Sequence, residues 1–562
     1  MNQDQNRLQK ALLLHQQGKL VEASDIYQEL LKENPNNYDA LHFLGIVKAS
    51  FGQPTEAREL IERSLKATRK NTAYIENYLA VLFQIGDYER MAEISAIAIR
   101  ENGRTEPFQY ALAVALLKLG RPQDAITEFD SLLSKNPNHL AGNNEKASAL
   151  AELKKYDEAL SYVEKALKIN PRYPDGLVNK ANILFEQGRF EAAVVAYQQA
   201  LKINPKLSTA WFGSGNALRD LGKYDDAIAA YDKAISLNKQ YAQAYFNKAL
   251  VSLCVGNYEE GWRLFEWRWQ NRYLKPYKKQ FSQPLWLGEE LLAGKTILLH
   301  AEQGLGDTIQ FCRYAKLVAE LGAKVILEVP KALTNLLANL SGVARITEEG
   351  SQLPPFDFQC PLMSLPLAFK TTLSNVPADV PYIKSDEEKS NFWKEKLSQK
   401  RKLRVGLVWS GGFRPNQPEV WAVNRRRNIP LAKLTVLMHP GIEFYSLQKG
   451  EPAETELGDL KRNHQPGAEI IDFTNLLADF SDTAALIDNL DLVISVDTST
   501  AHLAGAMGKP VWILNRFDTD WRWLSDKIDN PWYPTARLYR QQKVGDWDEV
   551  VQRVKTDLMN LI

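Results

Sequence analysis

A repeat of 34 residues constrains the fold of this chain more than any other feature of its sequence. Each unit has a turn and, in most units, a small residue five positions later. The turns fall at Gly18, Gly52, Gly86, Gly120, Lys154, Gly188, Gly222 and Gly256. Glycine permits the positive φ that a turn between two helices often requires, and a small residue lets neighbouring helices approach closely. Because each unit buries its apolar face only on its neighbours, the eight units predict a right-handed α-helical superhelix with a concave groove.

This period resembles the tetratricopeptide repeat, which folds as two antiparallel helices per unit. Prolines of one phase are expected to end the second helix of their units, namely Pro35, Pro137, Pro171 and Pro205. The resemblance implies that the groove binds a protein or peptide.

Three asparagines occupy the position of a ladder that grips extended backbone in relatives: Asn77, Asn179 and Asn247. The other five units have different residues at this position. We expect these asparagines either to contact a ligand or merely to solvate a helix face.

The overall composition argues against several classes of protein. With 562 residues the chain is too long for one hydrophobic core, and roughly three or four domains are expected. Its 69 basic and 68 acidic residues give a net charge of +1, which argues against nucleic acid as the main partner. The N-terminus shows no signal-peptide pattern, and no apolar stretch approaches the ~18 residues of a membrane helix. We therefore expect a cytoplasmic protein without stable membrane insertion.

The three cysteines, Cys254, Cys312 and Cys360, lack the spacing of a zinc site or a disulfide framework. We expect buried thiols in a reducing compartment.

The eighth repeat runs into an aromatic stripe, Trp262, Phe265 and Trp269, at helical spacing. We expect this stripe to attach a capping helix to the next domain, and a platform for stacking a sugar is the alternative. The following segment contains Pro276 and Pro284 and is typical of a connector.

From Lys295 onward, short apolar runs alternate with helical segments, as in a parallel sheet that is covered on both faces. Strands are expected at 296–300, 324–329, 405–409, 443–447, 492–496 and 511–514, and helices at 309–321 and 391–401. The two groups of strands predict two lobes, with ligands beyond the carboxyl ends of the strands.

The first candidate motif, His300 to Asp307, directly follows a predicted strand. It lacks the third glycine of a dinucleotide fingerprint and the Gly-Lys-Ser/Thr ending of a P-loop. What remains is a glycine turn that presents Asp307 at a strand end, where the start of a helix stabilises negative charge. The alternative is an ordinary N-cap aspartate.

The second motif, Asp497 to His502, follows the predicted strand 492–496. Hydroxyls and backbone N–H groups at the start of a helix suit a diphosphate, and His502 is suited to donate to a phosphate or a sugar. The alternatives are ordinary capping and a packed histidine.

Two more motifs also follow predicted strands. Ser410 and Gly411 form a turn with room for a ligand, near Arg427, whose forked guanidinium suits phosphate. Gln448 and Lys449 follow another strand, and Lys449 is expected either to reach an anionic leaving group or to lie on the surface. The run of arginines around Arg427 is also typical of a solvated face.

Together these motifs resemble glycosyltransferase family 9, the heptosyltransferase-like group, over about 296–550. The residues that carry the resemblance are Ala301-Glu-Gln-Gly-Leu-Gly-Asp307, Val408-Trp-Ser-Gly411, Ser446-Leu-Gln-Lys-Gly450, Asp497-Thr498, Ala501-His502 and Trp521-Arg-Trp523. The chain looks most like the bacterial branch that carries tetratricopeptide repeats ahead of the catalytic part. Its layout is also similar to that of O-linked N-acetylglucosamine transferase.

The resemblance implies an inverting transferase of the GT-B fold, with two Rossmann-like lobes. Asp307 would be the base that takes the proton of the acceptor hydroxyl as its oxygen attacks the anomeric carbon. The residues implied in binding the nucleotide-sugar donor are Ser410, Gly411, Arg427, Gln448, Lys449, Asp497, Thr498, Ser499, Thr500 and His502. Those implied in the turn on the acceptor side are Gln303, Gly304 and Gly306. Fixed hydrogen-bond donors would replace a metal, so neither a metal nor a cofactor other than the donor substrate is expected.

Two features depart from the pattern of the family. Asp518-Thr-Asp520 spells the D-x-D of metal-dependent transferases, outside the matching fold context. Relatives carry a short Asn-Arg-Ser-Ile-Pro-Leu run, whereas here Asn424-Arg-Arg-Arg-Asn-Ile-Pro-Leu431 follows a loop with Phe413-Arg-Pro and Glu419-Val-Trp421. The donor pocket is therefore expected to differ from that of relatives.

The predicted domains are a repeat array at 1–275, a connector at 276–295, an N-terminal lobe with the acceptor and the base at 296–400, and a C-terminal donor-binding lobe at 401–562. The first hypothesis is a transferase that acts on a protein or peptide recruited by the repeats. The second is a scaffold with a degenerate transferase part, against which Asp307, Asp497 and His502 argue. The third is transfer to a lipid-linked or cell-surface glycan, which predicts a basic or apolar patch facing a membrane.

Overall fold

The computed structural model describes residues 3–68, 70–271, 274–397, 401–412, 421–462 and 469–562. The chain divides into two compact units, 1–217 and 218–562. The domain boundaries expected at 275, 295 and 400 stay predictions beside this division.

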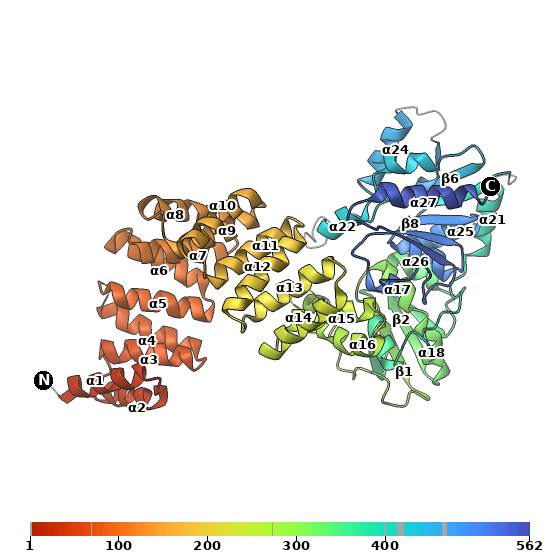
Figure 1. Ribbon diagram of the computed structural model, residues 1–562. Coiled ribbons are helices and arrows are strands. Elements are labelled where there is room, and N and C mark those ends of the chain that lie inside the picture. Colours follow the sequence, from red (N-terminus) through yellow and green to blue (C-terminus); the bar gives the residue numbers. More distant parts are fainter. Residues whose placement is uncertain (1–2, 69, 272–273, 398–400, 413–420, 463–468) are drawn as a thin grey trace. The chain divides into compact units, whose positions relative to one another are not determined.

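Successive helix pairs build the first unit (Figure 1). Their bounds are α1 Gln3–Gln16, α2 Leu20–Glu33, α3 Tyr38–Ser50, α4 Pro54–Ala67, α5 Thr72–Ile85, α6 Tyr88–Asn102, α7 Glu106–Lys118, α8 Pro122–Lys135, α9 Leu140–Glu152, α10 Tyr156–Ile169, α11 Pro174–Glu186 and α12 Phe190–Ile203, and the unit ends within α13 Ser208–Asp220. All eight turn residues of the repeat have positive φ, including the one that is not glycine, Lys154, at 61°. The repeated alanines, such as Ala57 and Ala125, are fully buried. The predicted tetratricopeptide fold is confirmed.

Two of the three ladder asparagines bond neighbouring repeats in the first unit. Asn77 Nδ2 lies 3.2 Å from Nε2 of His42, and Asn179 Nδ2 donates to the Asn144 carbonyl at 2.9 Å and to Ser148 Oγ at 3.0 Å. Both amides therefore contribute to the stacking of the repeats. Whether they also contact a ligand stays a prediction.

The second unit begins with the end of α13 and continues with three more repeat helices and two short 3-10 helices. Their bounds are α14 Tyr224–Leu237, α15 Ala242–Cys254, α16 Tyr258–Phe265, η1 Glu266–Gln270 and η2 Lys275–Tyr277. Trp262 is buried and packs edge-to-face on Trp521, with ring centroids 5.1 Å apart. This contact confirms the structural interpretation of the aromatic stripe. Trp269 lies on η1, where the Arg268 guanidinium is 4.3 Å from its ring centroid.

The first lobe of the second unit is a four-stranded parallel sheet in the order β3-β2-β1-β4. Its strands are β1 Thr296–His300, β2 Lys324–Val329, β3 Val343–Glu348 and β4 Phe358–Pro361. The associated helices are α17 Leu305–Phe311, α18 Tyr314–Glu320, α19 Lys331–Leu337, η3 Leu362–Ser364 and α20 Leu365–Ala368. The next helix of the chain, α21 Glu387–Lys396, packs on α25 (Phe480–Asp488) of the second lobe. The single helix expected at 309–321 is in fact two helices, interrupted at Cys312 and Arg313.

The second lobe is a six-stranded parallel sheet in the order β10-β9-β8-β5-β6-β7. Its strands are β5 Leu403–Val408, β6 Ile442–Ser446, β7 Ile470–Asp472, β8 Leu492–Val496, β9 Val511–Asn515 and β10 Ala536–Arg540. Its helices are α22 Trp421–Arg427, α23 Leu431–Leu434, η5 Thr435–Leu437, α24 Ala453–Arg462, η6 Thr474–Leu476, α25 Phe480–Asp488, α26 Ser499–Ala506, η7 Trp521–Trp523 and α27 Trp547–Met559. This is the strand order of a doubly wound sheet, and its connections reverse direction between β5 and β8. An α-helical repeat array followed by two parallel-sheet lobes confirms the predicted fold class.

One apolar core joins the last repeat helices to both lobes of the second unit, from Leu253 and Trp262 through Leu299 to Leu503. A second core fills the other face of the six-stranded sheet. The three cysteines are free and buried, which confirms the expectation of buried thiols. Among the described helices, none is long and apolar enough to cross a membrane.

Candidate active site at the sheet reversals

The carboxyl end of β1 presents Asp307 at the start of α17. In the four-stranded sheet the connections reverse direction between β1 and β4, so this end lies at the point where such sheets bind ligands. Gly304 is the N-cap of α17, and its N–H donates to Asp307 Oδ2 at 2.8 Å. Asp307 is the third residue of the helix and not the N-cap aspartate of the alternative interpretation, but it does help to cap the helix, while its side chain stays 19% exposed.

The carboxyl end of β8 presents the second predicted motif at the reversal of the six-stranded sheet. Thr498 is the N-cap of α26 but does not cap it with its side chain, because its Oγ1 lies 3.0 Å from Ser495 Oγ. Ser499 and Thr500 form the first turn of the helix, with Thr500 buried. The ordinary side-chain cap considered for these hydroxyls is therefore absent at Thr498.

Helices α17 and α26 pack directly against each other, which brings the first two motifs together (Figure 1). A Cβ added to Gly306 would lie 2.8 Å from His502 Cδ2 and 3.4 Å from Ser499 Cα. Only glycine fits this contact without displacement of its neighbours. The packing of the two helices therefore explains why position 306 is glycine.

His502 is buried and held on two sides. Its Nδ1 lies 2.9 Å from the Tyr533 hydroxyl, and its ring stacks on Trp523 with centroids 5.2 Å apart. Its Nε2 is 4.0 Å from Asp497 Oδ1. Burial, with a smaller effect from Arg522, lowers the pKa of His502 to about 3, so the ring is neutral at physiological pH. A neutral imidazole can donate a hydrogen bond to a substrate or accept one from it, but it contributes no positive charge to phosphate binding.

The ends of β5 and β6 hold the remaining predicted donor residues. Gln448 Oε1 accepts from the N–H of Ser410 at 2.9 Å, which ties the two strand ends together. The Arg427 guanidinium lies against Gly411, and its Nη1 donates to the Asp497 carbonyl at 2.9 Å. The turns after β5 and β8 are thus connected through Arg427. Lys449 is different, because its Nζ donates to the Leu477 carbonyl.

Arg522, which sequence reasoning included only as part of the Trp521-Arg-Trp523 motif, joins the two lobes at this point. Its Nη2 pairs with Asp307, its Nη1 lies 2.9 Å from Asp520 Oδ1, and its Nε donates to Gln310 Oε1 at 2.9 Å. Burial opposes the charge of Arg522, but Asp307 and Asp520 outweigh it and raise its pKa. Burial and the charge of Asp520 raise the pKa of Asp497.

A second buried carboxylate, Glu302, lies just before the glycine turn. Its side chain is 1% exposed, and Oε2 accepts from Arg268 Nη2 at 3.0 Å. Arg268 also donates to Glu266 and to Ser364 Oγ. Burial raises the pKa of Glu302 to about 7, although Arg268 opposes this shift. This network ties the end of the repeats to the end of β1.

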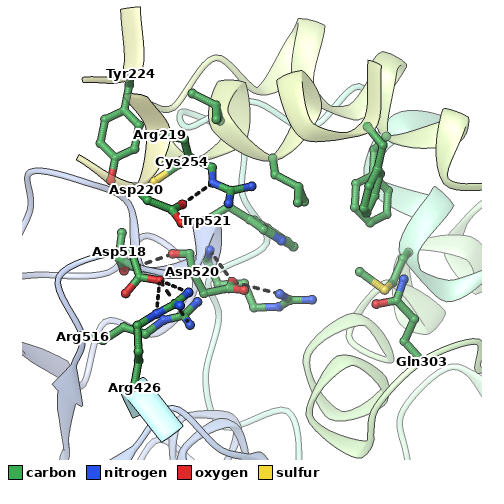
Figure 2. Close-up of a pocket in the computed structure, with 17 residues that line it drawn as sticks. Arg219, Asp220, Tyr224, Cys254, Gln303, Arg426, Arg516, Asp518, Asp520 and Trp521 are labelled. Atoms are coloured by element: carbon green, nitrogen blue, oxygen red, sulfur yellow. Dashed lines mark hydrogen bonds and ion pairs between the residues drawn. The ribbon is translucent and has the colours of Figure 1, made fainter. Parts of the chain in front are cut away.

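A pocket of about 320 Å³ opens beside this cluster, between both lobes and the last repeat helices (Figure 2). Gln303, from the first motif, lines it together with Arg522. About half of its lining was not singled out as a site at the level of sequence: Arg219, Asp220, Tyr224, Phe246, Leu250, Val251, Cys254, Met363 and Arg516. The available signals were the arginine run, the aromatic junction and Arg219 itself, which stands at a repeat position that is apolar in most other units, whereas Tyr224 follows the ordinary pattern of the repeat.

The D-x-D string lies in this pocket with both carboxylates engaged by arginines. Asp518 Oδ2 is 2.8 Å from Arg426 Nη2 and 3.5 Å from Arg516 Nη1, and Asp520 pairs with Arg522. Among the described residues, no group of three or more metal-binding side chains is found. The loop at 413–420, where a departure from relatives is expected, lies outside the described residues.

The fold and the site define a class: a repeat protein joined to a two-lobed α/β unit with a polar site between its sheets. Tetratricopeptide-repeat models match 14–81, 110–175, 178–244 and 212–260. The model of glycosyltransferase family 9 (heptosyltransferase) matches 449–515, which includes β8, α26 and β9. The chain therefore carries tetratricopeptide repeats followed by a segment, 449–515, that matches the model of glycosyltransferase family 9. Such repeats indicate protein–protein interaction, and the match to this family indicates a sugar donor.

One curated relative is Protein FlbA of Caulobacter vibrioides, 27% identical over 333 residues, which are 55% of this chain and 53% of FlbA. The chain thus spans about half the length of the curated relative that it matches.

Solved structures resemble this chain only weakly. The APC/C hetero-tetramer Cut9–Hcn1 has a TM-score of 0.35 at 16% identity, over 46% of this chain and 52% of that chain. MamA has a TM-score of 0.26 at 20% identity, over 30% of this chain and 98% of that chain. PilF of Pseudomonas aeruginosa has a TM-score of 0.31 at 19% identity, over 37% of this chain and 94% of that chain.

Proposed function

We propose that the chain is an inverting, metal-independent glycosyltransferase that moves a sugar from a nucleotide-sugar donor to a protein or peptide recruited by the repeats. The observation that carries this proposal is the meeting of α17 and α26. The turn after β1, which holds a carboxylate, and the helix start after β8 lie against each other, each at a sheet reversal. A base and an anion site from opposite lobes are what inverting transfer requires.

Each residue has a role in this scheme. Asp307 takes the proton of the acceptor hydroxyl as that oxygen forms a bond to the anomeric carbon and the diphosphate leaves. The diphosphate lies at the N-terminus of α26, where Thr498 leaves the first N–H groups uncapped by its side chain. Arg427, on the adjacent turn, stabilises the charge that develops on the leaving group.

One observation favours the alternative of a non-catalytic scaffold. Both oxygens of Asp307 already accept hydrogen bonds, one from Arg522 and one from the Gly304 N–H. A working base has to give up the contact with Arg522 when the acceptor binds. The scaffold is therefore a distinct prediction, in which this ion pair is permanent.

The test is release of nucleoside diphosphate from UDP-glucose, UDP-N-acetylglucosamine, GDP-mannose and ADP-heptose. We expect turnover of at least one donor by the wild type, and a loss of about 10²- to 10⁴-fold in kcat for Asp307→Asn. Asp379→Asn, at an exposed aspartate of the same lobe, is the matched control and should retain full activity. Donor binding without turnover in the wild type would refute the enzyme and support the scaffold.

The nature of the acceptor needs a separate measurement. A donor labelled in its sugar is incubated with the full chain and a cell extract, which is then divided into protein and lipid fractions. Label that protease releases as glycopeptides supports a protein acceptor, whereas label that extracts into organic solvent supports a lipid-linked glycan and contradicts the proposed acceptor.

A further inference from the structure

The end of the repeat array forms one wall of the pocket. Arg219 and Asp220 come from the end of α13, Tyr224 from the start of α14, and Phe246 and Leu250 from α15. Figure 2 shows Arg219 and Asp220 facing Asp518 and Asp520 of the C-terminal lobe across the pocket. Burial lowers the pKa of Arg219, but the charge of Asp220 and, more weakly, that of Asp518 outweigh it and raise the pKa. The charge of Asp518, on the opposite wall of the pocket, thus acts on Arg219.

The charges of the pocket are almost balanced. Four guanidinium groups line it, from Arg219, Arg426, Arg516 and Arg522, against three carboxylates, from Asp220, Asp518 and Asp520. Arg219 Nε lies 2.7 Å from Asp220 Oδ1, and the other three arginines are paired with Asp518 or Asp520 as described above. A diphosphate would meet carboxylates beside each guanidinium, so this pocket suits an uncharged polar group better than the phosphates.

Sugar hydroxyls match this arrangement. Each hydroxyl both donates and accepts, and an arginine–aspartate pair offers both kinds of partner side by side. The wall from α15 is apolar, and Trp521 adds an aromatic ring, which suits the C–H face of a sugar. A volume of about 320 Å³ is at the lower end of the roughly 300–1,000 Å³ of ligand pockets, so it suits one ring better than a whole nucleotide sugar.

We propose that Arg219 and Asp220, from the seventh repeat, contact the sugar of the donor and help to select it. The repeat array is then part of the transferase site as well as a recruiting surface. This inference rests on the proposed function, and it goes beyond it because it assigns the choice of sugar partly to a repeat.

Isothermal titration of the full chain separates contact with the sugar from contact with the nucleotide. The probes are UDP-glucose, UDP-N-acetylglucosamine, GDP-mannose and ADP-heptose, each compared with its own nucleoside diphosphate. For the nucleotide sugar that the wild type binds, we expect Arg219→Gln and Asp220→Asn to raise Kd about 10-fold or more. The Kd of the matching UDP, GDP or ADP should change less than twofold.

Two controls separate a loss of sugar contact from an unspecific effect of the substitution and from a loss of folding. Arg263→Gln removes an arginine of α16 that is 67% exposed and does not line the pocket, so it should leave both Kd values unchanged. Each single variant leaves a charged partner unpaired, and Asp220 is only 5% exposed. The double variant Arg219→Gln/Asp220→Asn keeps the pair uncharged and should melt close to the wild type while it still binds the nucleotide sugar weakly.

Other outcomes have distinct meanings. Equal weakening of the nucleotide sugar and of the nucleoside diphosphate would place the phosphates at Arg219 and overturn the inference. Unchanged Kd values in the double variant would overturn it as well, while the transferase proposal would stand. If the wild type neither binds nor turns over any of the four donors, the proposed function itself fails.

Discussion

Replacing Arg522 with glutamine removes the cation that lies between Asp307 of the first lobe and Asp520 of the second. The Arg522 side chain is 9% exposed, and those of Asp307 and Asp520 are 19% and 27% exposed. Removing one partner of a buried ion pair costs about 3–5 kcal/mol. Because both carboxylates retain contact with solvent, we expect the lower end, a loss of about 3 kcal/mol in the free energy of unfolding.

Urea unfolding followed by tryptophan fluorescence measures this loss in the second unit, where Arg522 lies. Twelve of the thirteen tryptophans lie in the second unit, all except Trp211. A double-mutant cycle of Arg522→Gln with Asp307→Asn isolates the pair, and a coupling of about 2 kcal/mol is expected because the asparagine no longer needs a cation. Arg537→Gln, at an arginine that is 51% exposed and paired with Asp557, should cost less than about 1 kcal/mol.

The reasoning would be refuted by additivity. If the two substitutions add to within about 0.5 kcal/mol, Arg522 does not hold Asp307 in solution. Asp307 would then be free to act as a base without exchanging a partner, and the scaffold alternative would lose its main support.

Three further substitutions test single features of the fold. Lys154→Gly relieves a positive φ of 61°, so it should stabilise the first unit by about 0.5–1 kcal/mol, and a lower melting point by far-UV circular dichroism would contradict this. Gly306→Ala places a Cβ 2.8 Å from the fixed ring of His502, so it should cost about 1–3 kcal/mol by tryptophan fluorescence, and unchanged stability would show that α17 and α26 pack loosely. Glu302 has a folded pKa of about 7 against an ordinary value of 4.5, so the folded state binds more protons between these values. Stability should therefore fall by roughly 3 kcal/mol as pH rises through this window, and Glu302→Gln should flatten the slope; a slope that persists in the variant would assign it to other groups.

The sequence predicts the interior strands well and misses the edge strands. The strands expected near 296–300, 324–329, 405–409, 443–447, 492–496 and 511–514 are all present, and each is an apolar run with neighbours on both sides. The four strands that were not expected, β3, β4, β7 and β10, are the four edges of the two sheets. An edge strand is paired on one side only, so it needs no continuous apolar run, and β3 has a single buried residue, Thr347, among exposed and half-buried ones.

The candidate site was predictable where its residues directly follow an interior strand. Ser410 and Asp497 are of this kind, and Asp307 follows β1 after a short glycine turn, because a buried strand fixes where its own carboxyl end lies. The repeat wall was not predicted, since Gly222-Lys-Tyr has the same pattern as the other turns, and the charged residue Arg219 at a position that is apolar in most other units was overlooked. Only the tertiary contact of the last repeats with the lobes brings Arg219 to the wall of the pocket.

The ion pairs of the pocket have a consequence for how a substrate enters. Arg426, Arg516 and Arg522 each follow the carboxyl end of a strand of the second lobe, so their guanidinium groups converge, and like charges this close would repel each other without the aspartates among them. The aspartates hold the guanidinium groups in place before any ligand arrives, so hydrogen-bonding partners for sugar hydroxyls are already oriented and little reorganisation is required on binding. The same argument explains why the repeat wall contributes an arginine together with its own aspartate: Arg219 without Asp220 would add uncompensated charge to a site whose balance favours a neutral ring.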